Sequence, residues 1–178
     1  DADAANASLV ADFYSSMENL VGDTDEAGSL NSLISDFEST LIEASSRPDS
    51  EARLASVVSK ANDLVEKVNE ISKELETVRT SADARIGQQV DTLNKSLVRV
   101  DELNAKILAA KSAGYDATAL MDERQSLVDT ISEIVPVREV SRDMDQISLY
   151  TTGGAILLEG TAMTVGFETS GIVTSSKT

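Results

Sequence analysis

The sequence contains no histidine, no cysteine and no tryptophan among its 178 residues. Without histidine it has no side chain whose ordinary pKa lies near neutrality, and without cysteine it has no thiolate nucleophile and no soft metal ligand. It also has no glycine-rich phosphate loop, nucleophile elbow or paired-cysteine zinc spacing. Acid–base catalysis would require carboxylates or lysines with strongly shifted pKa values. We therefore expect a protein that is not an enzyme, with no catalytic residues, no cofactor and no metal.

Aromatic residues are scarce at 3%, although 41% of the residues are hydrophobic and 26% are charged. A core of aliphatic side chains suits the packing of helices better than the wall of a deep ligand pocket. The formal net charge of -16 repels nucleic-acid phosphates and anionic lipid surfaces. We therefore expect neither nucleic acid nor a membrane as a partner.

Long apolar runs and a signal peptide are also missing, and the first residue is Asp1 and not methionine. The absence of cysteine does not distinguish a cytosolic protein from a secreted one without disulfides. We interpret the chain as a piece of a longer protein, so that missing targeting signals say little.

Apolar residues recur with helical spacing near the start of the chain and predict two helices. Turn formers at residues 22–29 (GDTDEAGS) separate the two, and Pro48 ends the second. Asp49 or Ser50 can then cap a third helix. The two apolar stripes are Leu9, Val10, Phe13, Met17 and Leu20, and Leu30, Leu33, Ile34, Phe37 and Leu41.

From Leu54 to Ile107 the apolar steps alternate between three and four residues, as in the heptads of a coiled coil. This spacing predicts one very long helix from about residue 50 to about residue 110. Steps of four between Val78 and Val90 form a stutter, and we expect a bend at the neighbouring Gly87.

A short turn with Gly114 is expected to end the long helix, and Asp116 is a candidate N-cap for the next helix. Tyr115 and Leu120 have the spacing of a hydrophobic staple. After so short a turn, this next helix should fold back along the end of the long one. Its apolar stripe is Leu120, Leu127, Ile131 and Ile134, with Val128 and Val135 beside it.

Beyond Pro136 the period of the apolar residues changes to two, which indicates strands. We expect strands near 135–137, 147–151 and 155–158, with a further strand at 162–167. Turns are expected at residues 142–146 and 151–154, where two glycines allow a tight hairpin. The tail at residues 174–178 is predicted to be disordered.

These patterns predict a mainly α fold: an elongated antiparallel helical bundle with one very long helix, plus a small C-terminal antiparallel β meander. We expect a helical bundle domain over residues 1–135. Residues 136–178 would be a β-rich appendage, the start of a second domain that continues beyond this chain.

Arg124 interrupts the apolar stripe between Leu120 and Leu127. A guanidinium at such a position must be paired or must reach water. We interpret it as one half of an ion pair with an acidic residue of the long helix. We predict that its side chain is partly buried and bonded to a carboxylate or a backbone carbonyl. A catalytic role would need a pocket and a base, and the sequence indicates neither. The candidate site residues are structural: Arg124, Asp122, Leu120, Leu127, Gly114 and Pro136.

A possible calcium loop begins at Asp23, Asp25 and Gly28. The match fails at Ala27 and Ile34, which stand where oxygen ligands are needed. A solvated turn is the interpretation that we favour.

Many glutamates and lysines line the long helix and suggest a binding strip, among them Glu66, Lys67, Glu70, Lys73, Glu74 and Glu76. A solvated outer face explains most of these charges, since charged residues are mostly exposed. An acidic docking surface remains open as an alternative.

Three stretches are similar to a single protein family. They are residues 14–69, which include SLNSLISDFESTL and RPDSEARLASVVSKA, residues 86–107 (IGQQVDTLNKSLVRVDELNAKI) and residues 119–140 (ALMDERQSLVDTISEIVPVREV). The chain resembles the flagellar hook-associated protein 1 family of bacteria, also called the first hook–filament junction protein. The likeness extends over about residues 7–160, and residues 120–137 are its most specific part.

This resemblance implies a structural component of the bacterial flagellum, an extracellular adaptor at the junction between hook and filament. It implies export by the flagellar secretion system, self-assembly in the full-length protein, and contacts with the hook protein and the second hook–filament junction protein. Family members carry terminal regions that form a coiled-coil inner tube. Both regions are missing here, so we expect this chain alone to be a monomer or a weak dimer.

Asp122, Glu123 and Arg124 would then be scaffold residues that hold the short helix to the long one. The alternative interpretation is a non-catalytic extracellular or coiled-coil binding module unrelated to flagella. The change of period at Pro136 favours the first interpretation, because a pure coiled-coil adaptor has no reason to switch to strands.

Overall fold

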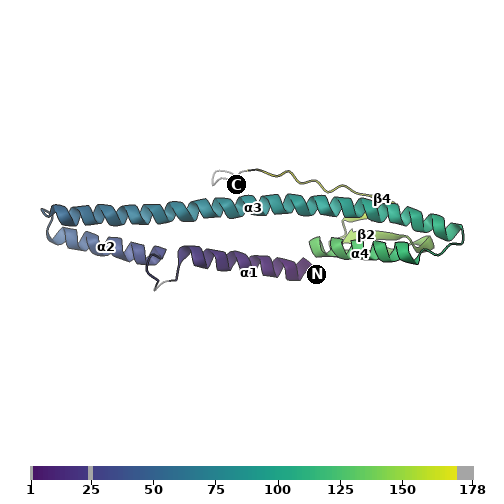
Figure 1. The fold of residues 1–178 in the computed structure, drawn as a ribbon, viewed down its shortest axis with the longest axis horizontal. Coiled ribbons are helices and arrows are strands. Elements are labelled where there is room, and N and C mark those ends of the chain that lie inside the picture. Colours follow the sequence, from purple (N-terminus) through teal and green to yellow (C-terminus); the bar gives the residue numbers. More distant parts are fainter. Residues whose placement is uncertain (1, 24–25, 172–178) are drawn as a thin grey trace. The chain divides into compact units, whose positions relative to one another are not determined.

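The computed structural model describes residues 2–23 and 26–171, and in this part of the chain it contains four α-helices and a small sheet (Figure 1). The predicted mainly α fold, with one very long helix followed by an antiparallel sheet, is confirmed. Asp25 and the tail at residues 174–178 lie outside the described residues. The elements are α1 Ala2–Val21, α2 Leu30–Ser46, α3 Glu51–Ser112, α4 Thr118–Ile134, β1 Val137–Ser141, the 3₁₀ helix η1 Asp143–Asp145, β2 Ile147–Thr151, β3 Ile156–Glu159 and β4 Thr161–Ala162.

The described residues divide into two compact units. The sheet unit contains residues 2–8 and 82–171, and the helical unit contains residues 9–23 and 26–81. The predicted domain boundary between residues 135 and 136 therefore falls inside the sheet unit. The reason is that apolar side chains of the sheet share one core with those of α3 and α4.

In the helical unit, α2 begins at a cap that the sequence pattern supports. The Oγ atom of Ser29 accepts a hydrogen bond from the main-chain N–H of Ser32 at 3.1 Å. Lys60 of α3 forms an ion pair with Asp36 of α2 at 3.0 Å. Among the apolar side chains described in this unit, only Ala44 is buried. The two predicted stripes therefore form helices whose apolar faces remain partly exposed.

In the sheet unit, the strands pair in the order β1-β2-β3-β4, and every pair is antiparallel. The register places Val137 opposite Thr151 and Leu149 opposite Leu158. Helix α4 folds back along the end of α3, as predicted (Figure 1). The buried core consists of Leu93, Leu97 and Val100 of α3, Val128 and Ile131 of α4, and Ile147, Leu149, Leu157 and Leu158 of the sheet.

The turn between α3 and α4 is a Schellman motif, the glycine-ended helix terminus that the sequence predicted. Gly114 has a φ of +76°, and the N–H of Tyr115 donates to the carbonyl of Ala110 at 2.9 Å. The predicted staple between Tyr115 and Leu120 is wrong, because Tyr115 is 73% exposed.

The cap of α4 also differs from the prediction by one residue. The cap residue is Ala117, which has no side chain for capping. Asp116 takes that role from one position earlier, since its Oδ1 accepts from the main-chain N–H of Thr118 at 3.0 Å and from the hydroxyl of Thr118 at 2.6 Å. These bonds lower the pKa of Asp116, the hydroxyl contributing most.

The predicted strand at residues 162–167 is wrong beyond Ala162, where β4 ends. The chain instead runs along α3 as an extended segment, residues 161–170, which we call the strap (Figure 1). Its main chain bonds to side chains of α3. The contacts are Ala162 N–H to Asp101 at 3.3 Å, Val165 N–H and C=O to Asn94 at 2.9 Å each, and Ser170 N–H to Asp83 at 2.8 Å.

Helix α3 continues without a break through Gly87, where a bend was predicted. This glycine permits the close approach of the strap. A Cβ atom at this position would lie 2.8 Å from the Cγ2 atom of Thr169, which is closer than carbon atoms pack.

Candidate functional site

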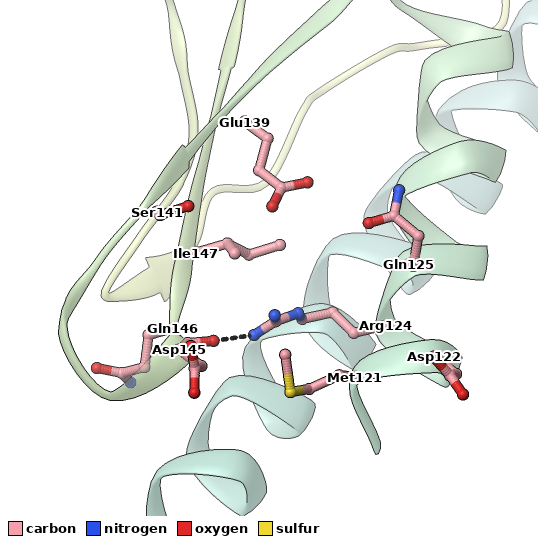
Figure 2. Close-up of a pocket in the computed structure, with 9 residues that line it drawn as sticks. All are labelled: Met121, Asp122, Arg124, Gln125, Glu139, Ser141, Asp145, Gln146 and Ile147. Carbon is pink, nitrogen blue, oxygen red and sulfur yellow. Dashed lines mark hydrogen bonds between the residues drawn. The ribbon is translucent and has the colours of Figure 1, made fainter. Parts of the chain in front are cut away.

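Arg124 joins three elements of the sheet unit: α4, α3 and the hairpin between β1 and β2. Figure 2 shows its bond to Asp145 of the hairpin. Its side chain is only 6% exposed. Its Nη1 atom donates to Oδ1 of Asn104 at 2.9 Å and to the carbonyl oxygen of Asp145 at 2.6 Å. The predicted burial of Arg124 and its bond to a backbone carbonyl are confirmed. The ion pair with an acidic residue of the long helix is wrong, because the guanidinium is bonded there to the neutral amide of Asn104.

Asn104 of α3 makes the second half of this connection. Its Nδ2 atom donates to the carbonyl of Ile147 at 2.9 Å, and its Oδ1 accepts from the N–H of Ile147 at 3.2 Å. The same Oδ1 accepts from Arg124. Asn104 is 5% exposed and Ile147 is 3% exposed. The amide of Asn104 therefore supplies hydrogen-bond partners to buried main-chain groups at the start of β2, which would otherwise be left without them. We call Arg124, Asn104, Asp145 and Ile147 the arginine node.

The hairpin offers the carbonyl of Asp145 from an unusual backbone conformation. Met144 and Asp145 have φ values of 56° and 58°, in the left-handed region that residues other than glycine seldom adopt. Such a conformation persists only where surrounding contacts hold it. Here the Asp145 carbonyl is bonded to Arg124, and its carboxylate forms an ion pair with Lys111 in the last turn of α3.

Burial and neighbouring charges shift the pKa values of Arg124 and Asp145 in the node. Burial lowers the pKa of Arg124, and the nearby carboxylates of Glu139 and Asp145 act in the opposite direction. The guanidinium nevertheless stays charged, because an unperturbed arginine pKa is far above neutrality. The hydrogen bond and positive charge of Lys111 lower the pKa of Asp145, so its carboxylate is ionised at neutral pH.

Of the acidic residues beside Arg124, one connects the helices and one does not. Glu123 of α4 accepts from Arg99 of α3 at 2.6 Å, and Arg99 also pairs with Glu102 at 2.8 Å. Asp122 is exposed and points away from the hairpin (Figure 2). Within the described chain it makes no hydrogen bond or ion pair, so the structure does not support the expectation that Asp122 holds α4 to α3.

The remaining predicted residues lie at the edges of the node. Leu120 and Leu127 are half-buried, and Leu127 packs against the core. Pro136 follows the end of α4, and its carbonyl accepts from the N–H of Thr152 at 3.1 Å. Sequence reasoning missed Asn104, whose only available signal was its place beside the heptad residue Leu103, which is fully buried.

A surface hollow of about 340 Å³ lies next to the node (Figure 2). Its walls carry the guanidinium of Arg124 with the carboxylates of Glu139 and Asp145, and no nucleophile paired with a base. In the described residues no group of three or more acidic, histidine or cysteine side chains could hold a metal ion. The same part of the chain has no helix both long and apolar enough to cross a membrane. What the node does do is connect three elements.

Comparisons with known proteins give one consistent result. The family model of the flagellar hook-associated protein FlgK helical domain matches residues 14–177. A curated relative, flagellar hook-associated protein 1 of Bacillus subtilis (strain 168), is 28% identical over 145 residues, which are 82% of this chain and 28% of the relative.

The fold is similar to that of the flagellar hook junction protein FlgK from Burkholderia pseudomallei. The TM-score is 0.74 at 21% sequence identity, and the match covers 82% of this chain and 25% of that one. The chain therefore spans about a quarter of the length of the relatives that it matches.

Proposed function

This chain belongs to the family of the flagellar hook-associated protein FlgK helical domain, and from that premise we propose that it is a structural part of the bacterial flagellum. Its role is that of an adaptor at the junction between hook and filament. The match of the family model to residues 14–177 carries this proposal, because it includes nearly the whole chain. The protein acts outside the cell, after export by the flagellar secretion system.

The contacts of the sheet unit support a mechanical and not a catalytic role. The buried guanidinium of Arg124 joins α4 to α3 and to the hairpin through its hydrogen bonds. Arg99 joins the same two helices at the surface through an ion pair with Glu123. A chain without histidine or cysteine has few groups for chemistry at neutral pH. A rigid connection between a long helix and a sheet suits a part that transmits load.

The partners that this role requires are other copies of the full-length protein, the hook protein and the second hook–filament junction protein. An acidic chain of net charge -16 would meet such neighbours through defined patches, because like charges repel over the rest of the surface.

Deletion of the coding region in the source bacterium tests the proposal. We expect cells that still make hooks but carry no attached filaments, and restoration by the wild-type gene. An epitope placed at the exposed Tyr115 should be labelled at the hook–filament boundary by immuno-electron microscopy. Normal filaments in the deletion strain would overturn the proposal and favour a binding module unrelated to flagella.

The proposed partners are tested separately by sedimentation of the chain alone and in mixtures. Addition of hook subunits or of the second junction protein should shift its sedimentation coefficient, whereas flagellin alone at the same concentration serves as the comparison. No shift with either protein would remove them as direct partners of this region.

A further inference from the structure

One face of the sheet carries two arginines without an ion pair in the described chain, Arg138 and Arg142. The register places Arg138 opposite Tyr150, so both side chains lie on the face opposite to the core residue Leu149. The N–H of Arg142 donates to the carbonyl of Gln146 at 2.8 Å, which continues the same pairing. Arg142 is four residues after Arg138 and therefore shares its face.

Apolar and aromatic groups accompany these charges. Val140 is 37% exposed and Ile156 is 47% exposed, and the pairing of β1 with β2 and of β2 with β3 places them on the same face. The guanidinium of Arg138 lies 5.7 Å from the ring centre of Tyr150, in a cation–π contact. We call this surface the outer sheet face: Arg138, Val140, Arg142, Tyr150 and Ile156.

The outer sheet face has the composition of a binding surface. Arginine and tyrosine are enriched in protein interfaces and carry much of their binding energy. Glu159 follows the core-facing Leu158 and so lies on the same side, yet it forms no ion pair with either arginine in the described chain. A cationic and apolar patch on a chain of net charge -16 fits an acidic partner.

The long helix of the same chain presents such an acidic surface. Glu66, Glu70 and Glu74 follow one another at intervals of four residues, so they line one side of α3, and all are exposed. Glu70 is paired with Lys67 at 3.2 Å, and the exposed Lys73 lies three residues after Glu70 on the same side, so carboxylates outnumber lysines there by three to two. Glu66 and Glu74 have no ion pair among the described residues. We call these three residues the acidic stripe.

The spacings of the two surfaces match. Four residues along a strand separate Arg138 from Arg142 by about 13 Å. Eight residues along a helix separate Glu66 from Glu74 by about 12 Å. We propose that the outer sheet face of one copy of this chain binds the acidic stripe of a second copy, Arg138 and Arg142 pairing with Glu66 and Glu74.

This inference rests on the proposed function, since it names residues for the self-assembly of a flagellar protein. The two surfaces belong to different parts of the chain, so one copy can offer its outer sheet face to a second copy and its acidic stripe to a third, which makes the contact heterologous. Each copy would keep a free outer sheet face or a free acidic stripe for the next copy. Contacts of this type build rings or open assemblies, as a junction around a tube requires.

The natural absence of cysteine makes a cross-linking test clean. Val140→Cys in one preparation and Glu70→Cys in another are mixed at low ionic strength with a mild oxidant. We expect the mixed disulfide dimer to exceed that of a Val140→Cys and Lys106→Cys pair by about threefold to tenfold, as two exposed ion pairs allow. The excess should fall at high salt.

Charge reversal supplies the decisive comparison. Arg138→Glu with Arg142→Glu in the Val140→Cys chain should remove the excess, and Glu66→Arg with Glu74→Arg in the partner preparation should restore it. Lys95→Glu with Lys106→Glu changes net charge equally at exposed positions of α3, and should leave most of the excess. Arg138→Gln with Arg142→Gln, checked by circular dichroism, separates loss of contact from loss of fold.

Three outcomes of the cross-linking experiment would overturn the inference. They are a yield no higher than that of the control pair, an excess that survives reversal of both arginines, and a predominance of Val140→Cys dimers in which the sheet face pairs with itself. Protection of the Val140→Cys thiol by hook subunits but not by a second copy would assign the face to another protein and overturn it too. None of these results would change the outcome of the deletion experiment, which tests the proposed function alone.

Discussion

Asn104 binds both main-chain groups of Ile147, donating to its carbonyl at 2.9 Å and accepting from its N–H at 3.2 Å. Asn94 likewise donates to the carbonyl of Val165 and accepts from its N–H, each at 2.9 Å. A helix has no free main-chain groups in its interior to pair with an extended segment. A primary amide has an N–H donor and a carbonyl acceptor. Each asparagine side chain of α3 therefore bonds to an extended segment in the way that the main chain of a neighbouring strand would.

Replacement of Arg124 by methionine should strongly destabilise the sheet unit. The change keeps an apolar stem but removes the donor to Asn104 and to the Asp145 carbonyl. We expect a loss of about 1.5–3 kcal/mol, the range for buried hydrogen bonds that involve a charge. Urea denaturation followed by the amide signals of Ile147–Thr151 measures this loss.

Arg99→Met is the matched control for that experiment. Arg99 also joins α3 to α4, but through ion pairs at the surface, where its side chain is 39% exposed. Such pairs contribute about 0–1 kcal/mol because water and salt screen them. Equal effects of the two substitutions would contradict the assignment of Arg124 as the buried connection.

The contributions of Arg124 and Asn104 should not be additive. Asn104→Leu leaves the main-chain groups of Ile147 without their partner and also removes one acceptor of Arg124. A double-mutant cycle with Arg124→Met and Asn104→Leu should give a coupling energy of about 0.5–3 kcal/mol. A coupling near zero in the same urea experiment would show that the two side chains act independently.

Periodicity in the sequence was sufficient to predict the helices and strands β2 and β3. Strand β1 was expected at residues 135–137 but begins at Val137 and continues to Ser141. The glycine at the end of α3 was also predictable, since Gly114 adopts a φ of +76° that few other residues accept. The sequence likewise singled out Arg124, because a charge inside an apolar stripe is conspicuous. Local signals of this kind depend on neighbours within a few residues, which is why they can be read without the fold.

Contacts between distant residues were not predictable in the same way. Asn104 is one polar residue among many on a long polar helix, and only the fold brings it to Ile147, 43 residues away. The strap failed as a strand for a similar reason, since its pairing groups come from α3 side chains and not from another strand. The acidic partner expected for Arg124 on α3 was not predictable either, because only the fold decides which α3 residue lies opposite Arg124, and that residue is Asn104.

Stability should depend on pH through Asp145. Lys111 lowers the pKa of Asp145 in the folded protein. The folded state therefore binds this proton less readily than the unfolded chain does, whose carboxyl has a pKa of about 3.9. The stabilisation is present above that pH and is lost as the pH falls through the lowered pKa of the folded state.

Two measurements test this dependence. The stability difference between the wild type and Asp145→Asn should narrow below about pH 4, and asparagine is a suitable replacement because it tolerates the left-handed backbone. An NMR titration of the Asp145 carboxyl should show its pKa moving up toward the ordinary value in Lys111→Gln. An unchanged titration in Lys111→Gln would contradict the cause assigned here.

Gly87→Ala should loosen the strap although it improves the helix. Alanine in place of glycine favours a helix by up to about 1 kcal/mol, but its Cβ would lie 2.8 Å from Cγ2 of Thr169. Thr169→Ser removes that methyl group. We expect faster amide exchange at Val165 and Ser170 in Gly87→Ala, and recovery with a net gain in stability when Thr169→Ser is added.

The strap runs opposite in chain direction to α3, since Ala162, Val165 and Ser170 bond in turn to Asp101, Asn94 and Asp83. A tension applied along the strap is thus parallel to the helix and crosses these bonds sideways. The hydrogen bonds between the strap and α3 are all loaded at the same time by such a pull, in shear. A pull away from the helix would break them one after another. The strap is therefore stronger against a pull directed along α3 than against a pull away from it.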